Sequence, residues 1–171
     1  YEELCVSRQD IPVASMCAIE YYGDSLLPLA RLYNLERELD QALQEKIWLK
    51  SGGFLIIQQT EAFVAIDVNT GKHSSKKDAE ENYKQINREA ALEIARQLRL
   101  RNLSGMILVD FINMKNTNDQ SELLQYMGSL VRSDPMQTVV VDVTALGIME
   151  ITRKKSAKTL AEQLLQLKKG E

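Results

Sequence analysis

The stretch Phe63-Val64-Ala65-Ile66-Asp67-Val68-Asn69-Thr70-Gly71 predicts the centre of this fold. A hydrophobic run that favours burial delivers a carboxylate, Asp67, and a buried charge is costly unless it is paired or binds a metal. The same pattern returns in Met106-Ile107-Leu108-Val109-Asp110-Phe111-Ile112-Asn113-Met114. If the two strands are neighbours, Asp67 and Asp110 converge on an oxygen-rich site suited to Mg²⁺ or Mn²⁺. Enzymes that cleave or form phosphodiester bonds commonly use such a metal site.

A plain structural interpretation of these aspartates stands beside this one. An aspartate at the end of a strand often only caps the turn that follows. Asn69, however, lies two residues beyond Asp67 and therefore on the same face of the strand. Two such strands, together with this asparagine, favour a functional site over two independent turn caps.

The composition is that of a soluble globular protein. The 171 residues, 44% hydrophobic and 26% charged, suit one ordinary domain or one domain with an appended piece. The net charge of −3 argues against binding nucleic acid by bulk electrostatics alone. No apolar run is long enough to span a bilayer, so no membrane association is expected. Because the chain starts at Tyr1 rather than Met, we expect it to be a fragment.

Cysteine and histidine usage narrows the chemistry further. Cys5 and Cys17 form no C-x-x-C pair, so neither a zinc site nor a disulfide framework is indicated, and a reducing, cytoplasmic setting is expected. His73 is the only histidine, which excludes His-rich metal sites and argues against a His-based catalytic triad.

Hydrophobic periodicity predicts an α/β fold with a mixed sheet. A short charged helix is expected over 35–45. From residue 54 onward the pattern predicts strands and helices in the order ββαβαββα. The expected strands are 54–58, 62–68, 106–111, 138–143 and 146–152. The expected helices are 78–101, 119–132 and a last one capped by Ser156 and running to residue 169.

Several motifs agree in order and spacing with one enzyme family. They are Ser51-Gly52-Gly53, Thr60-Glu61-Ala62, Ile66-Asp67-Val68-Asn69-Thr70-Gly71, Asn87-Arg88-Glu89-Ala90-Ala91, Ile94-Ala95-Arg96-Gln97-Leu98-Arg99-Leu100-Arg101-Asn102-Leu103, Val109-Asp110-Phe111-Ile112 and Gly147-Ile148-Met149-Glu150-Ile151-Thr152-Arg153. Together they resemble the catalytic core of the ribonuclease E/G family, from about residue 22 to about residue 153.

The resemblance implies a function and a division of the chain. It implies an endoribonuclease that cuts single-stranded RNA with Mg²⁺, for which Mn²⁺ can substitute, and leaves 5′-phosphate and 3′-hydroxyl ends. By motif, the metal ligands are Asp67 and Asp110, and Asn69 helps to position the scissile phosphate. Residues 51–171 then correspond to a deoxyribonuclease-I-like catalytic subdomain, and residues 1–50 to part of a ribonuclease-H-like segment with a connecting helix.

The sequence also departs from the family pattern. Asn113 stands where members usually carry a second aspartate, and Gln137 stands where an arginine that senses a 5′-monophosphate is expected. The N-terminal RNA-binding domain and the C-P-x-C zinc link that joins family dimers are not in this chain. We therefore expect weak activity from this chain alone, although a homodimer stays open.

Candidate RNA contacts come from two basic groups. Lys72, Lys76 and Lys77 directly follow the strand of Asp67, and a phosphate-binding role there competes with that of a plain loop. Arg96 lies on the long helix, where pairing with acidic neighbours such as Glu93 is the simpler interpretation. Trp48 can stack a base, although packing in a core or against another domain is the commoner use of an aromatic side chain.

Two function hypotheses follow from the sequence. The first is a Mg²⁺-dependent endoribonuclease core that acts in RNA processing and decay. The second is a non-catalytic RNA-binding or assembly platform that keeps the fold. A divalent cation between Asp67 and Asp110 discriminates between them, since only the enzyme needs one.

Overall fold

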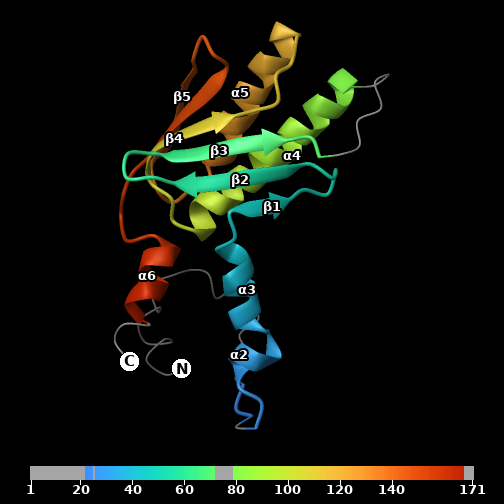
Figure 1. Ribbon diagram of the computed structural model, residues 1–171. Helices are drawn as coiled ribbons and strands as arrows, with labels where there is room; N and C mark the ends of the chain where they lie inside the picture. The colour runs from blue at the N-terminus through green and yellow to red at the C-terminus, as the bar shows by residue number, and fades with distance from the viewer. Residues whose placement is uncertain (1–21, 25, 72–78, 168–171) are drawn as a thin grey trace. The chain divides into compact units, whose positions relative to one another are not determined.

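A six-stranded sheet in the order β1-β2-β3-β4-β6-β5 organises the larger of two structural units, Gln41–Glu171 (Figure 1). The computed structural model describes residues 22–24, 26–71 and 79–167. The smaller unit, Tyr1–Asp40, contains helix α2 (Leu29–Leu32) and most of α3 (Leu35–Ala42).

The sheet is mixed, and its one parallel pair lies at the centre. Strands β3 and β4 run parallel, whereas every other neighbouring pair is antiparallel. Parallel neighbours need a long crossover, and α4 (Ala79–Leu100) lies between these two in the chain. The strands are β1 (Lys46–Trp48), β2 (Phe54–Gln59), β3 (Val64–Asn69), β4 (Gly105–Asp110), β5 (Thr138–Val143) and β6 (Ile148–Arg153).

Helices α4 and α5 (Thr117–Val131) lie behind the sheet in Figure 1, and their apolar residues share its core. Alternate residues of each central strand belong to that core, because successive side chains of a strand point to opposite faces. The buried apolar strand residues are Leu55, Ile57, Val64, Ile66, Val68, Ile107, Val109, Met149 and Ile151. The odd-numbered residues of β3 and the even-numbered residues of β4 therefore point to the opposite face, which we call the open face.

The mixed α/β class predicted from the sequence is confirmed. From β2 onward the strands and helices follow the predicted succession, and the hairpin of β2 and β3 and the long helix α4 lie within a few residues of their predicted bounds. The likeness to deoxyribonuclease I and the division at residue 51 stay predictions. Strand β1, which precedes that division, pairs with β2 in the same sheet.

Helix α2 of the smaller unit was not predicted, and two elements of the larger unit also differ from expectation. Strand β1 was not predicted, because three residues before a glycine turn are too few to show a period of two. The last helix, α6, spans Leu160–Leu167 and does not begin at Ser156. A capping box at Thr159 and Glu162 sets its start: the Thr159 N–H donates to the Glu162 carboxylate (2.7 Å), and the Glu162 N–H donates to the Thr159 hydroxyl (3.3 Å).

Among the helices of the described ranges, none combines the length and the apolar composition that a bilayer span requires.

Candidate active site

Asp67 and Asp110 lie directly opposite each other on neighbouring strands. The parallel register of β3 and β4 pairs Asp67 with Asp110 at the carboxyl ends of both strands. Neighbouring strands lie about 4.8 Å apart, and residues in register point to the same face of a sheet. Both aspartates are exposed, whereas Ile66, Val68 and Val109 beside them are buried. The structure thus brings together the two carboxylates that the sequence selected.

Asn69 joins this pair on the open face. Its side-chain amide donates a hydrogen bond of 2.8 Å to Oδ2 of Asp67. This bond holds one carboxylate oxygen of Asp67, and among the described residues no hydrogen bond to the other oxygen is formed. It also fixes the orientation of the Asn69 amide, whose own oxygen stays available as an acceptor.

The donor set fits a hard divalent cation. Mg²⁺ is commonly bound in proteins by one or two carboxylates and completes its shell with water and substrate phosphate. Within the described part of the chain, neither Asp67 nor Asp110 forms an ion pair, and no cluster of three or more His, Cys, Asp or Glu side chains is found. Asp67 and Asp110 are therefore the residues that would hold a cation here.

Glycines fix the backbone that carries Asn69. A Cβ atom at Gly53 would lie 2.8 Å from the carbonyl oxygen of Asn69 and 2.9 Å from the Ile86 side chain, so only glycine fits there. Gly71 has a φ of +69°, and a Cβ there would meet the carbonyl oxygen of Gly52. The turn before β2 and the end of β3 thus pack backbone to backbone.

Glu89 of α4 holds the same turn from the helix side. Its carboxylate accepts hydrogen bonds from the backbone N–H groups of Lys50 (2.5 Å) and Ser51 (3.0 Å). Burial raises the pKa of Glu89, but hydrogen bonds from Ser51 and Lys50 outweigh it, so the pKa lies below its ordinary value. The ionised carboxylate therefore anchors the turn at neutral pH.

Asn87 of α4 holds the segment that follows Asp110. Its fully buried side chain donates a hydrogen bond of 2.8 Å to the carbonyl oxygen of Ile112 and accepts one of 3.0 Å from the Ile112 N–H. A buried amide that satisfies both backbone groups of one residue fixes that residue in position. Helix α4 therefore positions the chain on both sides of the aspartate pair, through Glu89 and Asn87.

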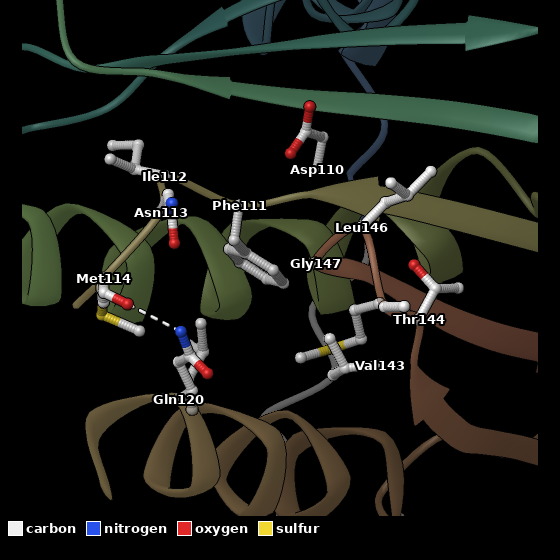
Figure 2. A pocket seen from close by; sticks show the side chains of 13 residues that line it. Asp110, Phe111, Ile112, Asn113, Met114, Gln120, Val143, Thr144, Leu146 and Gly147 are labelled. Atoms are coloured by element: carbon white, nitrogen blue, oxygen red, sulfur yellow. Dashed lines mark hydrogen bonds between the residues drawn. The ribbon is translucent and has the colours of Figure 1, made fainter. Parts of the chain in front are cut away.

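A cavity of about 330 Å³ opens beside Asp110 (Figure 2). In Figure 2, Asp110 points away from Phe111, which lies over the interior of the cavity, and Gln120 donates to the Met114 carbonyl oxygen (2.6 Å). Its lining combines apolar side chains with the amides of Asn113 and Gln120 and the hydroxyl of Thr144, and its volume is in the range of small-ligand pockets. The lining residues are Asp110, Phe111, Ile112, Asn113, Met114, Gln120, Leu123, Val143, Thr144, Ala145, Leu146, Gly147 and Met149.

The predicted RNA contacts divide into two cases. Lys72, Lys76 and Lys77 lie outside the described residues. Arg96 forms a bidentate pair with Glu93, with Nε and Nη2 2.9 and 2.8 Å from the carboxylate oxygens. Burial raises the pKa of Glu93, but the hydrogen bonds from Arg96 and Gln97 outweigh it and lower the pKa. The geometry supports the pairing interpretation of Arg96, and its contact with RNA stays a prediction.

Asn87 and Glu89 are positioning residues that sequence reasoning did not identify as such. Both stand in a motif quoted for the resemblance, but their hydrogen bonds join segments far apart in the chain. The sequence signal that could have identified Asn87 is a polar residue among the apolar residues that α4 buries, since a buried polar group requires partners.

The model of the ribonuclease E/G family matches residues 2–156. Ribonuclease G of Escherichia coli is 40% identical over 137 residues, 80% of this chain and 28% of that protein. Ribonuclease G of Salmonella typhimurium is 39% identical over 164 residues, 96% of this chain and 33% of that protein. Ribonuclease E of a Nostoc species is 39% identical over 135 residues, 79% and 20% of the two. The chain spans a third or less of the length of these relatives.

Proposed function

Because the chain belongs to the ribonuclease E/G family, we propose that it is the catalytic part of an endoribonuclease that cleaves single-stranded RNA with Mg²⁺ or Mn²⁺. One observation carries the proposal: Asp67 and Asp110 are paired in register on the open face, with Asn69 bonded to Asp67. Relatives named ribonuclease G and ribonuclease E support the reaction class.

Each residue of the site has a distinct role. Asp67 and Asp110 hold the cation, and Asn69 keeps Asp67 oriented through one amide N–H while its second N–H donates to the scissile phosphate. When bound, such a cation polarises a phosphoryl oxygen and makes water a competent nucleophile at neutral pH. Attack of water on the phosphorus breaks the bond to the 3′ oxygen and leaves 5′-phosphate and 3′-hydroxyl ends.

The open shape of the site supports a single-stranded substrate in this proposal. A pair of exposed carboxylates on an open sheet face admits a flexible single strand without a closed pocket around it. The net charge of −3 supplies no general attraction for a polyanion. Affinity therefore depends on local basic or aromatic groups and on any further RNA-binding domain of the protein.

The experiment is a cleavage assay on a 5′-labelled single-stranded RNA, at high protein concentration and low salt. We expect cleavage with Mg²⁺ and Mn²⁺, none with EDTA, and recovery when the metal is restored. Product ends are identified by ligation, which requires a 5′-phosphate and a 3′-hydroxyl. The matched control is Asp110→Asn, purified in the same way.

Three outcomes decide the proposal. Metal-dependent cleavage by the wild type and none by Asp110→Asn supports it. Metal-independent cleavage, or full activity of the variant, contradicts the assignment of the aspartates. If the chain binds RNA but cleaves it under none of these conditions, the result supports the alternative function, a binding or assembly platform.

A further inference from the structure

An aromatic pair, the exposed Trp48 and the half-buried Phe54, lies on the open face beside the aspartate site, with a cation over both rings. Trp48 on β1 and Phe54 on β2 have ring centroids 5.3 Å apart at 58°. The Lys46 ammonium lies 4.2 Å from the Trp48 centroid and 3.8 Å from the Phe54 centroid. Trp48 is 64% exposed, which is unusual for the largest apolar side chain of a small domain.

The sheet register places this cluster in one row with Asn69. Trp48 pairs with Phe54, and Phe54 pairs with Asn69. Residues in register share a face, and two inter-strand spacings separate Trp48 from Asn69, about 10 Å. Asn69 bonds Asp67, which is paired with Asp110. A continuous surface thus leads from the aromatic cluster to the carboxylates.

We propose that Trp48, Phe54 and Lys46 form a base-stacking subsite for a nucleotide near the cleaved bond of single-stranded RNA. The inference rests on the proposed function, which it deepens by naming a substrate contact. Trp48 offers its exposed ring to a base, Phe54 supports that ring from the side, and Lys46 meets the adjoining phosphate. A span of about 10 Å equals about three phosphates of a stacked strand, at roughly 3.4 Å each.

Other uses of this cluster explain less of it. A lysine on the edge strand β1 discourages pairing with another sheet, but that purpose requires no tryptophan beside it. Core packing is excluded by the exposure of Trp48 within the described unit. Aromatic rings with basic side chains close to them are the usual means of holding single-stranded nucleic acid, because every nucleotide has a base that can stack and a phosphate that needs a counter-charge.

The sole tryptophan of the chain gives a direct test. Trp48 emission is followed while a single-stranded oligoadenylate is added to the wild-type chain in EDTA, which prevents cleavage, up to millimolar concentration. We expect saturable quenching. An abasic oligonucleotide with the same number of phosphates is the control, and it should bind without this quenching, since it has no base to stack.

Kinetics with Mg²⁺ separate stacking from chemistry. Trp48→Ala should raise KM about tenfold, a typical value for one stacked base, and leave kcat nearly unchanged, while Trp48→Phe should retain most of the affinity. Val139→Ala, on β5 at the opposite end of the sheet and also exposed, should change neither parameter. A tenfold fall in kcat for Trp48→Ala at unchanged KM would overturn the proposal.

The outcomes separate the two proposals. Cleavage without base-dependent quenching overturns the subsite and leaves the nuclease assignment standing. Base-dependent quenching without any cleavage retains the subsite and contradicts the nuclease assignment. A shift of Trp48 emission that depends on protein concentration, without RNA, would instead assign this face to a second copy of the chain and overturn the subsite.

Discussion

The two faces of the central sheet are built from the same strands and carry opposite chemistry. On the helix-covered face, Val64, Ile66 and Val68 of β3 are at most 5% exposed. On the open face, the residues between and beyond them include Asp67 and Asn69. Because side chains alternate along a strand, the face that stabilises the fold also sets the position of the face proposed to act.

Charges differ between the faces in the same way. Arg153 of β6 lies on the covered face, and its side chain, 3% exposed, pairs at 2.8 Å with Asp134, 2% exposed. Asp67 and Asp110 on the open face are exposed and form no ion pair within the described residues. A buried charge needs its partner for the fold to be stable, whereas two exposed carboxylates paired in register, with no ion-pair partner among the described residues, are accessible to a ligand.

The largest expected effect separates activity from stability. Asp67→Asn or Asp110→Asn should lower kcat by about 10³-fold or more, because the cation site supplies several kcal/mol of transition-state stabilisation. The melting temperature should stay unchanged or rise slightly, since one of two repelling carboxylates is neutralised. Metal-saturated kinetics and thermal unfolding measure the two effects.

The adjacent residue is the matched control for this prediction. Ile66→Ala removes a side chain that is 2% exposed on the covered face and should cost about 2–5 kcal/mol of unfolding free energy. The kcat of the remaining folded protein should be near normal. Near-normal turnover of Asp67→Asn, or a loss of stability like that of Ile66→Ala, would contradict the assignment of activity to the open face and stability to the covered face.

The second prediction concerns Asn69. Asn69→Ala should lower kcat by about 10²-fold with little change in KM, because a preorganised amide contacts charge that develops in the transition state. It also frees the Oδ2 atom of Asp67. Steady-state kinetics with and without excess Mg²⁺ measure the effect, and an unchanged kcat with a raised KM would reduce Asn69 to a ground-state contact.

The sequence predicted the parts of this molecule that depend on local pattern. Period-two and helical spacing were enough for the β2–β3 hairpin, β4 and α4, and the paired positions of Asp67 and Asp110 followed once the strands were assumed to be neighbours. What it did not predict depends on contacts distant in the chain. Asn87 reaches Ile112, and the row from Trp48 to Asn69 exists only through the register of three strands.

The third prediction tests such a long-range contact. Asn87→Ala leaves the Ile112 N–H and carbonyl groups without their partner and should destabilise the protein by about 1–3 kcal/mol. kcat should fall less than for Asn69→Ala, because Ile112 lies two residues beyond Asp110. Asn87→Asp, which keeps the acceptor but buries a charge opposite the Ile112 carbonyl oxygen, should be at least as destabilising as Asn87→Ala at neutral pH. A fall in kcat at full stability would instead place Asn87 in the chemistry.

The fourth prediction is acid sensitivity from the covered face. Burial raises the pKa of Asp134, but hydrogen bonds from Arg153, the Met136 N–H and the Thr138 hydroxyl outweigh it, so the folded-state pKa lies below its ordinary value of about 3.9. A depressed pKa adds stability that is present above the ordinary value and lost as pH falls through the folded-state value. Unfolding free energy should therefore decline below about pH 4.

Denaturant titrations between pH 7 and pH 2.5 measure this decline. Thr138→Val keeps the side-chain shape and removes one bond to Asp134, 2.9 Å long, so its stability should depend less steeply on pH. A wild-type slope equal to that of Thr138→Val would show that this hydroxyl does not depress the pKa of Asp134.

The smallest expected effect is that of Arg96→Ala. Arg96 is 56% exposed and pairs with Glu93, and an exposed pair of this kind contributes about 0.2–1 kcal/mol. It follows Asn87 by nine residues, about 14 Å along the axis of α4, so it lies away from the helix end that holds the segment after Asp110. KM for RNA and its salt dependence should both stay unchanged.

Joint replacement of Lys72, Lys76 and Lys77 by Ala should instead raise KM and flatten its salt dependence, because phosphate contacts release counterions. A raised KM for Arg96→Ala with no change for the lysine variant would reverse this assignment and place the RNA along the helix.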